Sequence, residues 1–359
     1  MEKTYVFPDI NNICLINGNI RELDKIEQMS IEQFANLEKP NMPTKFYKYY
    51  SNTLNLQDNR NYSIEALESN EVYLNKPSLF DDVFDSEISI TLDEFEENMI
   101  KTLMCWSNCK SPEKTSINDM INEFIVHVNT LLQEKRSLNN IFETDQCEEA
   151  EKLQAEIIAY KWMIESKRYD LTTALLNVIK SEYREFSDKL QNVFRVACFS
   201  STPMSQLMWG GAYANEHRGF CLEYTVQPDK KYENLIQNVW PVIYSKRRRT
   251  VTNAIMEVYF SNWKNDALRD LYLNGVLRKS IDWAYQYEWR LVLPPQKDQE
   301  AFQTEFFPIT KVFLGNRMEI KERKKIIDIC KRKNIPYTGV LRSRDYFEMK
   351  ECEYSCENC

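Results

Sequence analysis

The spacing of hydrophobic and polar positions divides the chain into helical and extended parts. Between residues 91 and 190 apolar side chains recur every three or four positions, as they do along one face of an α-helix. Ser116 and Asp119 form a capping box before one such stripe, and Asp170 precedes a second stripe. Residues 91–190 are therefore expected to be helical.

Outside that stretch, short runs of β-branched and aromatic residues between turn residues predict strands. They fall at 45–50, 71–74, 194–199, 219–225, 239–244, 288–293 and 311–314, and helices are expected at 254–279 and 320–333. Strands on both sides of a helical block predict an α+β protein, a discontinuous mixed or antiparallel sheet core with a central helical insertion. The expected parts are an N-terminal extension (1–44), the core (45–90 and 191–340), the insertion (91–190) and a C-terminal tail (341–359).

Composition excludes several common kinds of site. The 7 glycines cannot form either of the common glycine-rich phosphate loops, and His127 and His217 are too few for histidine-rich metal clusters. The 10 cysteines occur without a secretory signal, which indicates reduced thiols and a cytoplasmic protein. No apolar run of about 18 residues exists, so no membrane contact is expected.

Charge is distributed unevenly. The net charge is −8 overall, with −14 in residues 1–190 and +6 in residues 191–359. A polyanionic partner is expected to meet the basic half, where Lys246–Arg249 is the candidate contact for a nucleic acid or nucleotide, unless this run is only a solvated loop. The acidic helical insertion is the candidate contact for a partner protein.

Two loops carry candidate polar chemistry. Asp81, Asp82 and Asp85 could orient ribose hydroxyls or bind a cation, or they could form an ordered acidic turn pinned by flanking phenylalanines. His217 lies between a predicted helix and a predicted strand. There Arg218 would lower its pKa and Gly219 would allow a tight turn, or the histidine could be structural.

A predicted strand begins with Glu288 among aromatic residues, and strand alternation places Arg290 on the same face. The glutamate could stabilise a developing cation, or it could form a structural pair with the arginine. Near the end of the chain, Cys352, Cys356 and Cys359 have a spacing compatible with an iron–sulfur cluster or zinc, but also with a polar tail. No metal is assigned to them.

Each motif is weak alone, but their order resembles that of a large bacterial family of uncharacterised proteins often found among defence and toxin genes. The matching segments lie within about residues 45–316: Tyr47-Lys48-Tyr49, Tyr73–Asp85, Cys198-Phe199-Ser200, Leu207–Cys221, Trp283–Arg290 and Phe313-Leu314-Gly315. Asp81 and Val83 depart from the usual asparagine and proline of that pattern.

At a greater distance, the layout is similar to the ADP-ribosyltransferase fold, especially its DNA-targeting toxins. Glu288-Trp-Arg-Leu-Val-Leu, followed by Ile309–Val312, follows the pattern of the strand that opens with a catalytic glutamate and of the next strand. The resemblance implies that Lys48 or Tyr49 holds NAD and that Ser200 belongs to the serine motif.

The resemblance also implies a mechanism with NAD as substrate and without a metal. Glu288 would hold the ribose 2′-hydroxyl and stabilise positive charge as nicotinamide leaves. Tyr213 or Tyr287 would stack on nicotinamide, and Lys48 and Arg290 would meet the pyrophosphate. The expected catalytic residues are thus Glu288, His217 and Tyr213, and the expected NAD-binding residues are Lys48, Tyr49, Ser200, Arg290, Asp82 and Asp85.

The expected function is therefore that of an ADP-ribosyltransferase-like toxin or defence effector acting on a nucleic acid or a protein. Two alternatives remain. In a metal-dependent nuclease or phosphodiesterase, Asp81, Asp82, Asp85 and Glu288 would hold Mg²⁺, with His217 as general base. In a non-enzymatic module, the basic half would bind a nucleotide or nucleic acid.

Overall fold

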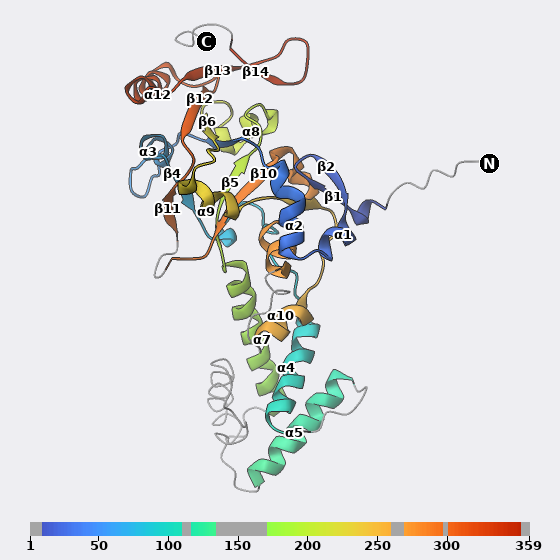
Figure 1. Ribbon diagram of the computed structural model, residues 1–359. Coiled ribbons are helices and arrows are strands. Elements are labelled where there is room, and N and C mark those ends of the chain that lie inside the picture. Colours follow the sequence, from blue (N-terminus) through green and yellow to red (C-terminus); the bar gives the residue numbers. More distant parts are fainter. Residues whose placement is uncertain (1–8, 110–115, 134–170, 260–268, 297–300, 353–359) are drawn as a thin grey trace, which may run out of the picture. The chain divides into compact units, whose positions relative to one another are not determined.

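The computed structural model describes residues 9–109, 116–133, 171–259, 269–296 and 301–352 (Figure 1). The chain divides into two compact units. Unit 1 comprises Met1–Glu87, Asn192–Arg247 and Gly275–Cys359, and unit 2 comprises Ile88–Gln191 and Arg248–Asn274. Unit 1 holds mixed sheets with helices, so the fold class is α+β, as expected.

Unit 1 is built on an eight-stranded sheet with the order β14-β13-β12-β6-β3-β5-β10-β7. All neighbours are antiparallel except β12 and β13, which are parallel and are joined by the helix α12 (Ile320–Lys333). The strands are β3 (Lys45–Tyr50), β5 (Arg195–Ser200), β6 (Phe220–Thr225), β7 (Val239–Pro241), β10 (Glu288–Leu293), β12 (Ile309–Leu314), β13 (Tyr337–Arg342) and β14 (Met349–Glu351).

Aromatic side chains hold one face of this sheet in place. Phe46 of β3 and Phe199 of β5 are buried with Trp289 of β10 in a single apolar cluster. Phe306 stacks on Phe199 with 4.2 Å between ring centroids. The same cluster buries Ile326 and other apolar residues of α12, which places that helix on this face. The ends of β3, β5 and β10 are thereby fixed, and the candidate site lies there.

Two smaller sheets complete unit 1. The first has the order β2-β1-β8-β9, and the second pairs β11 with β4. Their strands are β1 (Ile13–Ile16), β2 (Asn19–Glu22), β8 (Ile243–Ser245), β9 (Arg278–Ser280), β4 (Glu71–Leu74) and β11 (Phe302–Glu305). Because β1 pairs with β8 and buries Cys14 and Ile16, residues 13–22 are part of the unit rather than a separate extension. In the same way β14 pairs with β13, inside the segment expected to be a tail.

Short helices connect these strands. They are α1 (Leu23–Glu27), α2 (Ile31–Glu38), α3 (Tyr62–Ser69), α8 (Gln206–Gly210) and α9 (Glu233–Asn238). The 3₁₀ turns are η1 (Ile10–Asn12), η2 (Lys39–Asn41), η3 (Pro77–Leu79), η5 (Ala212–Ala214), η6 (Lys230–Tyr232) and η8 (Ile281–Gln286).

Unit 2 contains α4 (Leu92–Trp106), α5 (Ile117–Gln133), α7 (Leu171–Gln191) and α10 (Thr252–Tyr259). The Asp119 amide donates to Ser116 Oγ at 3.2 Å, which confirms the capping box. Phe124 and Val128 of the predicted stripe are buried. His127 Nε2 lies 2.9 Å from the Ser107 carbonyl oxygen, a structural contact. Among the described residues, no helix combines the length and apolarity that crossing a membrane requires.

The expected helix at 254–279 is wrong at its C-terminal end. The chain instead forms a π-helical turn, η7 (Tyr272–Val276), and then the strand β9. Residues 278–280 pair in parallel with β8, and buried ion pairs of Arg278 and Lys279 accompany this pairing. Tertiary partners thus override a local pattern that favours helix, and they bring Lys279 to the site described next.

Candidate functional site

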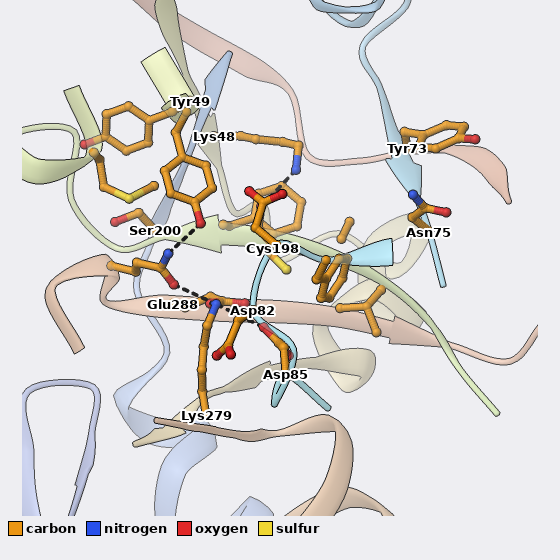
Figure 2. A pocket seen from close by; sticks show the side chains of 18 of the residues that line it. Lys48, Tyr49, Tyr73, Asn75, Asp82, Asp85, Cys198, Ser200, Lys279 and Glu288 are labelled. Carbon is orange, nitrogen blue, oxygen red and sulfur yellow. Dashed lines mark hydrogen bonds and ion pairs between the residues drawn. The ribbon is translucent and has the colours of Figure 1, made fainter. Parts of the chain in front are cut away.

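A pocket opens in the large sheet where β3 and β5 separate. The structure describes both strands completely, and one register pair joins them, Tyr47 opposite Ser200. Beyond that pair, residues of both strands line a pocket of about 350 Å³ (Figure 2), a volume typical of small-molecule sites. Its aromatic residues are Tyr47, Tyr49, Tyr73, Phe80, Phe199 and Tyr213. Its charged residues are Lys48, Asp81, Asp82, Asp85, Lys279 and Glu288.

Four buried charged groups form a network at one side of this pocket. Lys279 Nζ donates to Glu288 Oε2 at 2.8 Å and lies 3.0 Å from Asp85 Oδ2. Arg290 Nε donates to Glu288 Oε1 at 2.7 Å, and Arg290 Nη2 donates to the Asp85 carboxylate at 2.8 Å. Each carboxylate therefore contacts both cations, and the formal charges of the four groups cancel.

This pairing keeps the network ionised although it is buried. Burial by itself raises the pKa of Glu288, but the charges of Arg290 and Lys279 outweigh burial and hold that pKa well below its ordinary value. Burial by itself lowers the pKa of Lys279, but Glu288 and Asp85 raise it above the ordinary lysine value. The pocket wall thus carries a carboxylate that is charged at neutral pH and has a fixed orientation.

Hydrogen bonds extend the network to an aromatic wall of the pocket. Lys279 Nζ also donates to Gln286 Oε1 at 2.8 Å, and Gln286 Nε2 donates to Tyr213 Oη at 2.9 Å. Tyr287, which follows Gln286, has a left-handed backbone (φ 47°). Gln286 and Glu288 both line the pocket, while the Tyr287 ring is largely exposed.

Lys48 is a second cation of the pocket, on the opposite strand. Its Nζ donates to the Cys198 carbonyl oxygen at 3.0 Å and lies 5.3 Å from the centroid of the Phe199 ring. Burial lowers the pKa of Lys48. In the described part of the chain, no carboxylate forms an ion pair with this ammonium, in contrast to Lys279. The group can therefore bind an anionic ligand without breaking an existing pair.

The acidic loop after β4 closes another side of the pocket. Asp82 Oδ1 accepts a hydrogen bond from the Phe84 amide at 3.0 Å, and the Asp82 carbonyl accepts one from the Asp85 amide at 3.0 Å. The Phe80 ring lies 5.9 Å from the Arg290 guanidinium, so Phe80 anchors the loop as expected. The Phe84 side chain, which was also expected to anchor the loop, is 55% exposed.

Most residues expected to form the site meet at this pocket. Lys48, Tyr49, Ser200, Tyr213, Asp82, Asp85 and Glu288 all line it. Arg290 does not: its side chain is fully buried, and its nitrogens donate to Glu288, Asp85, Ser86 and the Val276 carbonyl. Arg290 therefore meets the pocket only indirectly, through lining residues that it contacts: the carboxylates of Glu288 and Asp85 and the ring of Phe80.

His217 lies outside the pocket lining and is held by packing. Its ring stacks on Trp209, with 6.2 Å between ring centroids. Burial and the charge of Arg317 lower its pKa, whereas Arg218, the cation expected to do so, pairs with Glu216 at 2.7 Å.

The turn at His217 also differs from expectation. Asn215, Glu216 and His217 all have positive φ, whereas Gly219 is needed for space. A Cβ at Gly219 would lie 2.0 Å from the Tyr50 carbonyl oxygen.

The described residues of the other sequence motifs are not among those that line the pocket. In the basic cluster, Arg247 Nη2 donates to Glu27 Oε2 at 3.0 Å and also to Asp24, so this arginine is used within unit 1. Cys352 is disulfide-bonded, which departs from the expectation of reduced thiols. The other described cysteines are free, as expected: Cys14, Cys105, Cys109, Cys198, Cys221 and Cys330. Cys356 and Cys359 are outside the described residues.

Sequence reasoning missed Lys279 and Gln286, which connect the two sides of the site. Lys279 falls in a stretch with a helical pattern, and nothing in its neighbours indicates an ion pair with residues about 200 positions earlier. Gln286 belongs to the aromatic segment before Glu288. Strand alternation from Glu288 does not predict its position, because Gln286 ends the 3₁₀ turn η8 and Tyr287 has a left-handed backbone.

Comparison with known proteins supports the resemblance to an uncharacterised family over one segment. Residues 208–291 match the model of the family DUF2971, described as a protein of unknown function. The matched segment includes Tyr213, His217, Lys279, Gln286 and Glu288–Arg290. No curated protein and no solved structure matches the chain.

Proposed function

We propose that the pocket binds NAD and that the protein transfers ADP-ribose from it. One observation carries the proposal. Lys48, Ser200 and Glu288, each expected from the ADP-ribosyltransferase pattern, stand on three neighbouring strands and line one pocket. Because these residues are far apart in the sequence, local structure alone does not bring their side chains to one pocket. A buried, ion-paired carboxylate and a polar strand end beside aromatic rings suit a ligand with a base, a ribose and a phosphate.

Glu288 is the catalytic residue in this proposal. The N-glycosidic bond between ribose C1′ and nicotinamide breaks, and its electron pair goes to the ring nitrogen, so that nicotinamide leaves uncharged. A lone pair of the acceptor forms the new bond to C1′, and the acceptor proton is released. The Glu288 carboxylate accepts a hydrogen bond from the ribose 2′-hydroxyl and stabilises the positive charge that develops on the ribose. Arg290 and Lys279 are positioning residues, because they keep this carboxylate ionised and oriented.

The remaining pocket residues bind and orient NAD. Lys48, which has no carboxylate partner in the described chain, donates to the pyrophosphate oxygens. The Tyr213 ring stacks against nicotinamide, and its hydroxyl is held by Gln286. Arg290 is too deeply buried to reach a phosphate. In this proposal the pyrophosphate is therefore bound by Lys48 and not by Arg290.

The geometry fits the metal-dependent nuclease less well. Asp85 and Glu288, two of its proposed ligands, are each paired with Lys279 and Arg290, so a divalent cation would have to displace an ammonium and a guanidinium. His217, its proposed base, does not line the pocket. A nucleotide-binding module without catalysis would use the same pocket, and the experiment below separates the two.

The test is the release of free nicotinamide from NAD, measured by chromatography. Water can serve as the acceptor, so the natural target is not needed. The wild type should release nicotinamide, and Glu288→Gln should slow release by about 10²–10³-fold. NAD binding without release would identify a binding module, and absence of both would overturn the proposal.

A matched control separates catalysis from stability. Glu27 is also a buried carboxylate between two cations, Arg247 and Arg278, but it lies outside the pocket lining. Glu27→Gln and Glu288→Gln should both lower the melting temperature, since each takes a carboxylate charge away from a buried cation, Arg278 in the first case and Lys279 and Arg290 in the second. Only Glu288→Gln should lose turnover when both are assayed well below their melting temperatures. Equal loss in the two variants would contradict the catalytic role.

A further inference from the structure

The loop between β13 and β14, residues 343–348, displays two adjacent aromatic side chains to solvent. Tyr346 is 73% exposed, and Phe347 is completely exposed. Neither ring packs on the apolar clusters that hold the rest of this unit. Packing within the folded unit therefore does not explain why these two positions are aromatic.

Two arginines flank the same loop. Arg342 and Arg344 are exposed, and within the described residues neither forms an ion pair with a carboxylate. The surrounding sequence is basic: residues 320–350 carry 10 Lys and Arg against 4 Asp and Glu, although the whole chain has a net charge of −8. The aromatic rings thus stand beside uncompensated guanidinium groups.

The loop has a defined shape and lies against the element that lines the catalytic pocket. The Ser343 amide donates to the Glu348 carbonyl oxygen at 2.9 Å, and Ser343 Oγ accepts hydrogen bonds from the Asp345 and Tyr346 amides. Residues 342–349 and Gln206 of α8 form a groove of about 520 Å³. At its base, Met349 is buried in one cluster with Met208 of α8, which lines the pocket.

We propose that this loop binds single-stranded nucleic acid, with Tyr346 and Phe347 stacking on bases and Arg342 and Arg344 contacting phosphates. Exposed aromatic rings need unstacked bases, which a duplex does not offer, and arginine forks match phosphate oxygens. This activity goes beyond the proposed NAD chemistry and does not depend on it.

The experiment measures the fluorescence anisotropy of a labelled oligothymidylate of about 16 nucleotides, a usual site size, in the absence of NAD. The full chain should bind it with an affinity that falls as salt rises. Tyr346→Ala with Phe347→Ala should weaken binding about 10-fold or more, because each stacked base contributes a factor of that order. Leu56→Ala, which removes an apolar side chain from another exposed loop, is the matched control and should leave binding unchanged.

A second pair of variants tests the phosphate contacts. Replacing Arg342 and Arg344 by glutamine should reduce the slope of log affinity against log salt by about 1.4, since each single-strand phosphate contact accounts for about 0.7. The control is Lys230→Gln, at an exposed lysine in η6. It should change the slope by less than the value of one phosphate contact, about 0.7.

Several results would overturn the proposal. The first is that the protein does not bind the oligonucleotide, and the second is that the aromatic variant binds it as tightly as the Leu56→Ala control. The third is that a DNA duplex competes as well as an unlabelled single strand. The fourth is that the protein binds phosphatidylserine vesicles and not the oligonucleotide. The loop variants should retain the wild-type melting temperature, because the replaced side chains are exposed. Since the assay contains no NAD, its failure would leave the NAD proposal standing, and loss of nicotinamide release would not affect this result.

Discussion

Lys279 Nζ lies 2.8 Å from Glu288 Oε2 at the wall of the pocket, and both side chains are almost completely buried. The lysine comes from β9 of the small sheet, and the glutamate is the first residue of β10 in the large sheet. This pair therefore joins two sheets, and it also keeps the carboxylate charged. Stability and the proposed chemistry depend on the same contact, so the two must be measured separately.

Removing Lys279 should destabilise the protein strongly. Lys279→Met leaves Glu288 and Asp85 with Arg290 as their remaining cation in the network, and breaking a buried pair from one side costs about 3–5 kcal/mol. Urea unfolding measures this loss. Lys311→Met is the matched control, because Lys311 pairs with Glu351 at the surface and such pairs contribute about 0–1 kcal/mol. Equal, small losses in both variants would show that the buried network adds little stability.

The network should also make stability depend on pH in the acid range. The pKa of Glu288 is lower in the folded protein than its ordinary value of 4.5. The unfolded chain therefore binds more protons, and the stability from this group is fully present above pH 4.5 and is lost as pH falls below it. Urea midpoints between pH 6 and pH 3, a range that spans this value, should fall less steeply for Glu288→Gln than for the wild type. Parallel curves would show that Glu288 is not the titrating group.

Two lysines on one strand offer a direct test of ligand binding. Lys48 lines the pocket without a carboxylate partner in the described chain, whereas Lys45 pairs with Glu223 at 2.9 Å outside the pocket lining. Lys48→Gln should weaken NAD binding about 10-fold or more, because a hydrogen bond to a charged group contributes about 1.5–3 kcal/mol. Isothermal titration calorimetry measures both affinities. The Lys45→Gln variant should retain the wild-type affinity, and equal weakening would argue against a specific role for Lys48.

Gly219 should tolerate no side chain. A Cβ there would lie 2.0 Å from the Tyr50 carbonyl oxygen, whereas a Cβ at Gly210 would meet nothing within 4 Å. Gly219→Ala should therefore cost about 3 kcal/mol or more, since β3 and β6 would have to separate. Gly210→Ala should be neutral or slightly stabilising, because alanine favours the helical conformation of α8. Thermal unfolding of the two variants gives the comparison, and a stable Gly219→Ala protein would contradict the close approach.

Local pattern was sufficient for the secondary structure of much of the chain. The stripe behind Ser116 predicts α5 because helix periodicity follows from backbone geometry and does not depend on what covers the apolar face. The run at 288–293 likewise predicts β10 with Glu288 at its start. Local pattern failed at 278–280, where pairing with β8 and the burial of Arg278 and Lys279 outweigh a helical preference.

The candidate site could be predicted only in part. The acidic loop and the strand that begins with Glu288 pointed to Asp82, Asp85 and Glu288. The resemblance to ADP-ribosyltransferases implied Lys48, Ser200 and Tyr213, and all six residues line one pocket. His217 stood in an equally polar motif, but its ring packs on Trp209 instead. Sequence alone cannot separate these cases, because the direction of a side chain at a turn depends on which strand passes beside it.

The sequence by itself determined the class of the fold, the residues able to carry charge in the core, and the exclusion of glycine-rich phosphate loops. These properties follow from residue type and spacing, which need no knowledge of distant contacts. Only the tertiary structure decided that Glu288 would be shared by Lys279 and Arg290 and that Lys48 would stand without a carboxylate partner in the described chain. Electrostatic energies depend on distances of a few ångströms between side chains, and strand pairing sets those distances.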